Sequence, residues 1–121
     1  MSQLKIKIIL LCFVSINLLA QKEFDKYGPA GCMVYTDLKE ALKIETRVYK
    51  LDLSYKKIEP KLYEKLPKLK DLQALKLGSN ELTDYPKGFD ALTNLVYFAS
   101  YNNKLTAFPP NLMPFGLMYY L

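Results

Sequence analysis

Apolar residues recur along the second half of the chain in a repeated pattern of short alternating segments. Leu75 and Leu77 alternate with polar neighbours, which predicts a short strand that directs both leucines to one side. Similar segments begin at Val48, Leu72 and Leu95, so their starting points lie 24 and then 23 residues apart. A strand of this kind cannot bury its apolar side alone. Stacking of successive copies is therefore expected to give a parallel sheet and a shared core.

The middle copy carries the most complete version of the pattern. Its five fixed positions hold Leu72, Leu75, Leu77, Asn80 and Leu82. This spacing resembles the signature LxxLxLxxNxL of the leucine-rich-repeat family, and the resemblance covers the chain from Val48 to its end. The outer parts of the second and third copies also align, with Pro86 and Pro109 where no ladder hydrogen bond is needed. The resemblance implies an α/β-type solenoid, a horseshoe with a short parallel sheet on its inner curve.

Asn80 and Asn103 stand where the chain turns out of its strands. An asparagine amide can both accept hydrogen bonds from backbone groups and donate to them at such a turn. In leucine-rich-repeat proteins this residue forms a ladder up the stack. The first copy has Lys56 at the same position, and because lysine carries no acceptor, the ladder is expected to begin at Asn80. Ser100 occupies an inward apolar position, where we expect its hydroxyl to bond an adjacent backbone carbonyl.

Residues 1–20 have the character of a signal peptide. Lys5 and Lys7 precede an apolar run from Ile8 to Ile16, and polar residues follow Ala20. The run is shorter than the roughly 20 apolar residues that span a bilayer, so cleavage after Ala20 is favoured over an uncleaved membrane anchor. We therefore expect an exported chain with no stable membrane span after cleavage, located in the periplasm, at the cell surface or outside the cell.

Two segments separate the signal peptide from the repeats. Residues 21–34 contain a turn-rich stretch from Tyr27 to Cys32 and are expected to form a tether. Cys32 is the one cysteine beyond residue 20, and we favour a small buried residue over an intermolecular bridge or a reactive thiol. In residues 35–47, Asp37 precedes apolar residues at helical spacing, which predicts an amphipathic cap helix across the first strand.

The repeats occupy residues 48–121 as three copies and the start of a fourth. In this alignment Met118 and Leu121 take the first and fourth positions of the fourth copy. The C-terminal end of the stack is then expected to be open, which favours a fragment of a longer array over an edge covered by a partner chain.

The charge and composition of the chain indicate few candidate catalytic or ligand-binding residues. Loss of residues 1–20 removes two of the 17 basic residues and none of the 12 acidic ones, which leaves a net charge of +3. Six lysines between Lys56 and Lys70 could hold an acidic ligand, but we favour a solvated surface and expect no nucleic-acid partner. Beyond residue 20 there is no histidine, cysteine pair or nucleotide-binding loop, so no enzyme, cofactor or metal site is expected.

Outward positions of the predicted strands are rich in tyrosine, which offers a large contact area with few rotatable bonds. We expect a partner-binding concave face made of Tyr49, Asp52, Tyr55, Lys76, Tyr97, Tyr101 and Asn102. Tyrosines also suit strands for structural reasons, so each one alone could serve either role. The predicted function is an exported recognition module for a protein, or for a glycan. The alternative is a targeting or regulatory segment of a larger secreted enzyme or of a surface adhesion protein.

Overall fold

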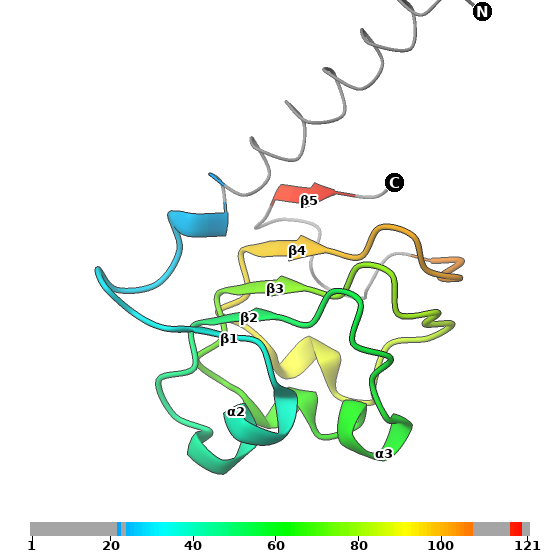
Figure 1. Cartoon of the computed structure of the whole chain (residues 1–121), viewed down its shortest axis with the longest axis horizontal. Coiled ribbons are helices and arrows are strands. Elements are labelled where there is room, and N and C mark those ends of the chain that lie inside the picture. Colours follow the sequence, from blue (N-terminus) through cyan, green and yellow to red (C-terminus); the bar gives the residue numbers. More distant parts are fainter. Residues whose placement is uncertain (1–21, 23, 108–116, 120–121) are drawn as a thin grey trace, which may run out of the picture.

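Short strands alternate with helical turns along most of the chain (Figure 1). The computed structural model describes Lys22, residues 24–107 and residues 117–119. The predicted signal peptide, residues 1–20, lies outside the described residues, as do Pro109 and Leu121.

The strands form one parallel sheet in which they lie side by side in chain order. They are β1 (Val34–Tyr35), β2 (Lys50–Asp52), β3 (Ala74–Lys76), β4 (Tyr97–Ala99) and β5 (Leu117–Tyr119). Leu51, Leu75 and Phe98 occupy directly adjacent register positions in β2, β3 and β4. The predicted parallel sheet of an α/β arrangement is therefore present, and the apolar positions of the first three copies are in phase.

Helical turns cover one side of this sheet (Figure 1). They are α2 (Leu38–Ile44), α3 (Pro60–Tyr63) and the 3-10 helices η1 (Leu66–Lys68) and η2 (Phe89–Ala91). The core between the turns and the sheet is built from leucines and phenylalanines of successive copies, and Leu75 and Leu77 at its centre are fully buried. We call the side of the sheet that carries Leu51, Leu75 and Phe98 the core face.

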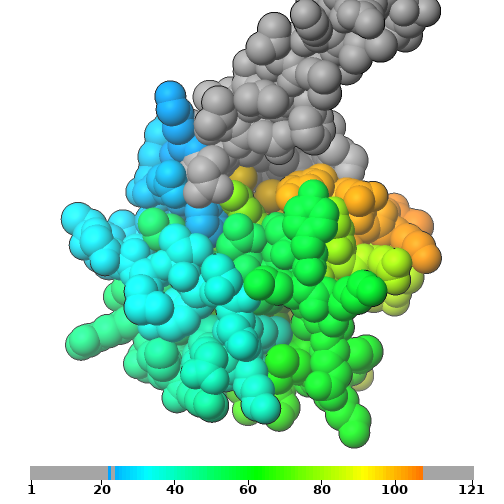
Figure 2. Space-filling view, in the orientation of Figure 1, coloured from blue at the N-terminus to red at the C-terminus, as the bar shows by residue number. Residues whose placement is uncertain are grey.

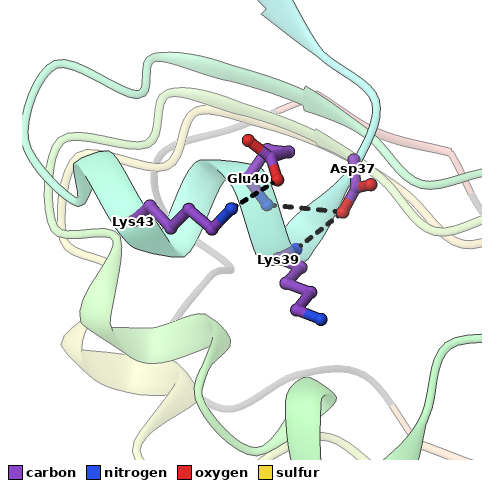
Figure 3. A network of polar contacts seen from close by, with 4 residues as sticks. All are labelled: Asp37, Lys39, Glu40 and Lys43. Atoms are coloured by element: carbon purple, nitrogen blue, oxygen red, sulfur yellow. Dashed lines mark hydrogen bonds and ion pairs between the residues drawn. The ribbon is translucent and has the colours of Figure 1, made fainter.

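Helix α2 lies within residues 35–47, where the cap helix was predicted, and Asp37 is its N-cap. Asp37 Oδ1 accepts hydrogen bonds from the backbone N–H groups of Lys39, at 2.9 Å, and Glu40, at 3.3 Å (Figure 3). Glu40 also forms an exposed ion pair with Lys43, with 2.8 Å between Oε1 and Nζ, and this contact raises the pKa of Lys43. The two acidic residues thus satisfy and stabilise the first turn of the helix.

The turns after β2 and β3 are closed by asparagine side chains. Asn80 Nδ2 donates to the carbonyl oxygens of Leu53, at 2.7 Å, and Leu77, at 2.9 Å, while Asn80 Oδ1 accepts from the Lys56 N–H at 3.0 Å. Asn103 repeats the arrangement one copy later, and its Oδ1 accepts from the Asn80 N–H at 2.9 Å. The predicted hydrogen-bond ladder is confirmed, and it begins at Asn80 because Lys56 contributes its backbone N–H and no acceptor side chain.

The predicted hydrogen bond of Ser100 is wrong. Ser100 is buried on the core face, yet its Oγ has no hydrogen-bond partner among the described residues. The carbonyl oxygens of Leu77 and Ser100 itself accept from Asn103 Nδ2 instead, at 2.8 and 3.0 Å. The amide that closes the turn therefore donates to two carbonyl groups next to Ser100, and the predicted bond from the Ser100 hydroxyl to an adjacent carbonyl is not made.

The register of β5 also differs from the repeat alignment. Met118 was assigned the position of Leu95, whereas in the sheet it lies opposite Phe98. Leu121 had been expected at that place. Met118 and Leu121 are both apolar, so the sequence alone allows either residue opposite Phe98, although the two registers differ by an odd number of residues and assign opposite sides to the rest of the strand.

Candidate binding surface

The sheet has a second side, directed away from α2 and α3, that carries three of the predicted binding residues, Asp52, Lys76 and Tyr97. Because side chains alternate along a strand, residues on either side of Leu51, Leu75 and Phe98 in sequence belong to this side. We call it the tyrosine face. In register order it presents Lys50, Ala74 and Tyr97, then Asp52, Lys76 and Ala99.

The N-terminal segment of the described chain packs on the tyrosine face (Figures 1 and 2, blue). Phe24 is 0% exposed, and its ring meets Tyr97 edge-on with 5.7 Å between ring centroids. Tyr27 lies at the same distance from Tyr97, and the Gly28 N–H donates to Gln73 Oε1 at 3.0 Å. Residues 24–28 are therefore packed against the sheet, and the prediction that residues 21–34 form a tether is wrong for this part.

The turn that holds this segment depends on Gly28, which has a φ of 82°. A Cβ at Gly28 would lie 2.6 Å from Cys32 Sγ and 3.0 Å from Tyr49 Cβ. Cys32 is a free, half-buried thiol whose Sγ lies 3.9 Å from the Tyr27 carbonyl oxygen. Tyr49, predicted to contact a partner, is half-buried beside this turn.

Tyr97 is a further correction to the predicted surface. It was expected to point into solvent, but it is 1% exposed and forms a small buried cluster with Phe24, Ala74 and Ala99. Its orientation toward the tyrosine face was predicted correctly, since it alternates with Phe98. Its burial was missed because Phe24 and Tyr27 had been assigned to a tether. Their aromatic character and spacing of three residues were the available signal that this stretch packs on the domain.

Lys76 lies on the tyrosine face beside the same segment and is 8% exposed. Its Nζ stands over the Phe24 ring at 4.4 Å from the centroid, a cation–π contact. Burial lowers the pKa of Lys76, while the carboxylates of Asp52 and Asp25 oppose that shift. Asp52, half-buried on the neighbouring strand, also accepts from the Ser54 N–H at 3.1 Å. The lysine is thus held between one aromatic ring and two carboxylates.

The remaining predicted residues gather where the strands end. Tyr55 is 73% exposed and Asn102 is also exposed, with Asn102 Nδ2 3.0 Å from Ser79 Oγ. The Tyr101 ring packs directly on Gly78, where a Cβ would lie 2.3 Å from the ring. Burial raises the pKa of Tyr101, and the nearby Tyr55 adds to the shift. Tyr55, Ser79, Tyr101 and Asn102 therefore form one cluster with two exposed and two half-buried members, which we call the exposed rim.

The backbone of the exposed rim has an unusual conformation. Tyr55, Ser79 and Asn102 occupy equivalent positions directly before the ladder position, and their φ angles are 60°, 57° and 53°. Asparagine adopts this left-handed conformation readily, whereas for a bulky side chain it is an outlier. Tyr55 is therefore placed in solvent by a backbone conformation that disfavours it.

The other surfaces hold fewer candidates. All six lysines between residues 56 and 70 are exposed. Within the described residues there is no cluster of His, Cys, Asp or Glu that could hold a metal ion. In the same part of the chain, no helix has the length and apolar character to cross a membrane. A comparison with protein-family models finds no match, and a comparison with curated proteins finds no significant one.

Proposed function

We propose that the chain is an exported recognition module of the leucine-rich-repeat type, a horseshoe whose inner surface is the tyrosine face. Three copies in register and the asparagine ladder of Asn80 and Asn103 support this assignment. The partner is a protein, bound at the exposed rim. Tyrosine, serine and asparagine together suit protein recognition, because they combine large contact area with adaptable hydrogen bonding.

The conformation and exposure of Tyr55 carry this proposal. A left-handed backbone costs most residues other than glycine about 1 kcal/mol or more. For Tyr55 this cost is not offset by burial, because the side chain is 73% exposed. The turn of the repeat requires this conformation at Tyr55, Ser79 and Asn102 alike, but of the three it holds an aromatic ring at Tyr55, and a residue kept where the backbone disfavours it is typical of functional positions. An exposed aromatic ring next to Tyr101 is suited to anchor a partner.

The experiment compares capture of secreted and surface proteins of the source organism by variants of the chain. Tyr55→Asn removes the ring but tolerates the left-handed backbone, so the fold should persist. If Tyr55 is an anchor, the affinity for the captured protein should fall about thirtyfold, the equivalent of about 2 kcal/mol. The matched control is Lys65→Ala with Lys68→Ala, two exposed residues on the helical side, which should leave the affinity unchanged.

Loss of capture in the lysine variant, with normal capture by Tyr55→Asn, would move the binding site to the helical side and contradict the proposal. Export is tested separately by N-terminal sequencing of the protein recovered outside the cytoplasm. We expect the sequence to begin at Gln21. Recovery of intact Met1 from the cytoplasm alone would contradict export.

A further inference from the structure

Residues 24–28 lie on the tyrosine face in the manner of a bound peptide. Phe24 fills the space over Ala74 and Ala99 and contacts Tyr97 edge-on, while the Gly28 N–H is held by Gln73. The segment adds no strand to the sheet, whose order runs from β1 to β5 without it. Its attachment includes the ring contacts with Tyr97 and the hydrogen bond from Gly28 to Gln73 and no strand pairing, which is the kind of attachment that a competing peptide can replace.

We propose that this part of the tyrosine face binds a peptide of the partner protein in which an aromatic residue is followed by an acidic residue. Residues 22–28, Lys-Glu-Phe-Asp-Lys-Tyr-Gly, are an internal version of that ligand and must leave before the partner peptide binds. This inference rests on the proposed recognition function and extends it from the exposed rim to the covered part of the same face.

The shape of the site explains why the proposed peptide carries an aromatic residue. Ala74 and Ala99 are small and buried, so they leave room above β3 and β4 for a ring. Tyr97 offers its ring at 68° to that of Phe24, an arrangement that aromatic pairs prefer. Lys76 Nζ then lies 4.4 Å from the centre of the Phe24 ring. A cation at this place favours an aromatic side chain over an aliphatic one of similar size.

The charge of the site explains why an acidic residue follows the aromatic residue in the proposed peptide. Lys50 and Lys76 are both buried on this face, each 8% exposed, with Asp52 beside Lys76 in the register. On the tyrosine face, β2 and β3 thus carry two positive charges against one negative charge. Asp25 of the segment adds a carboxylate that acts on Lys76. A peptide with an acidic residue after its aromatic residue would restore this charge balance when the segment leaves.

Two substitutions should release the segment without touching the core face. Phe24→Ala removes its aromatic anchor. Gly28→Ala places a Cβ 2.6 Å from Cys32 Sγ and 3.0 Å from Tyr49 Cβ in a left-handed conformation, which should open the turn. The two changes act at different points of the segment. Agreement between them therefore reports release and not a local effect of one side chain.

The test measures binding of a fluorescein-labelled peptide of residues 22–28 to the full chain by fluorescence anisotropy. In the wild type the internal segment competes, so the apparent affinity is reduced by the fraction of molecules with a free site. We expect both release variants to bind the peptide at least about tenfold more tightly than the wild type does. Adding Lys76→Gln to either variant should weaken this binding, because it removes the cation over the ring.

Two control peptides make the result specific. In one the phenylalanine is replaced by alanine, and in the other the aspartate is replaced by asparagine, and both should bind the release variants more weakly. Equal binding of all three peptides, or no gain in either release variant while circular dichroism shows a folded chain, would overturn the inference. Loss of capture in Tyr55→Asn bears on the proposed function alone. If the peptide does not bind the release variants while Tyr55-dependent capture persists, this inference is overturned and the proposed function stands.

Discussion

The two faces of the sheet are buried to a similar depth for different reasons. On the core face, Leu51, Leu75 and Phe98 are covered by helical turns of the repeats themselves, so each copy completes its neighbours. On the tyrosine face, Tyr97 is just as inaccessible, but Phe24 and Tyr27 from outside the repeats cover it. Burial of the core-face residues therefore forms and is lost together with the stack of repeats. We expect the contact of Phe24 and Tyr27 with Tyr97 to be lost without unfolding of the sheet, because these two residues lie outside the repeats.

The largest effect is expected on the core face. Leu75→Ala should lower the free energy of unfolding by about 2 to 5 kcal/mol, because it leaves a cavity in the centre of the stack. Urea denaturation followed by circular dichroism measures the change. Phe24→Ala is the comparison on the other face, and its smaller effect should come with faster hydrogen exchange at the Gly28 N–H. Equal losses of stability in the two variants would break the distinction between the faces.

The ladder that joins the copies should give the next largest effect. Asn80→Ala leaves the carbonyl oxygens of Leu53 and Leu77 and the Lys56 N–H without that side chain, so stability should fall by about 2 to 3 kcal/mol. Asn94→Ala is the matched control, since Asn94 makes one exposed hydrogen bond, from Nδ2 to the Lys70 carbonyl oxygen. Thermal unfolding of both variants is the measurement. A loss for Asn94→Ala as large as that for Asn80→Ala would show that the ladder contributes no special stability.

A gain in stability is expected from Ser100 on the core face. Ser100→Ala removes a buried hydroxyl that no described group bonds, and stability should rise by about 1 kcal/mol. Ser79→Ala is the control, because its hydroxyl lies 3.0 Å from Asn102 Nδ2 at the exposed rim and its loss should not stabilise the protein. Urea midpoints compare the two variants. A destabilised Ser100→Ala protein would mean that the hydroxyl finds a partner in solution.

The smallest effect concerns pH and Lys76 on the tyrosine face. Burial lowers the pKa of Lys76 below the 10.5 of an unfolded lysine, so between these two values the unfolded state binds more protons. The contribution of Lys76 to the free energy of unfolding should therefore rise as the pH increases toward 10.5. Urea midpoints of the wild type and of Lys76→Gln, measured from neutral to alkaline pH, should diverge in favour of the wild type. Parallel profiles would indicate that Lys76 is solvated as in the unfolded chain.

The core face and the turns could be predicted from the sequence because local rules determine them. Alternation of apolar residues identifies the inward side of a strand, and the asparagine amide has the donors and the acceptor that the turn requires. Asp37 similarly precedes its helix at a position where an acidic cap is favoured. Such features need no knowledge of distant parts of the chain.

The covered part of the tyrosine face could not be predicted by the same rules. The orientation of Tyr97 follows from alternation, but its burial depends on Phe24, which lies far away in the sequence and in no repeat. The same limit applies to Ser100, whose carbonyl neighbours are taken by Asn103. Met118 and Leu121 are both apolar candidates for the place opposite Phe98, and alignment of the repeats selected the wrong one, so the register of β5 required the structure.

The ladder also makes each turn depend on a residue that is synthesised after it. The Lys56 N–H is accepted by Asn80, 24 residues later, and the Asn80 N–H by Asn103, 23 residues later. A ribosome adds about 5 to 20 residues per second from the N-terminal end. Each of these turns thus cannot close until at least about one to five seconds of further synthesis have supplied the asparagine of the next copy. A ribosome stalled before Asn80 therefore carries a first copy whose turn cannot close.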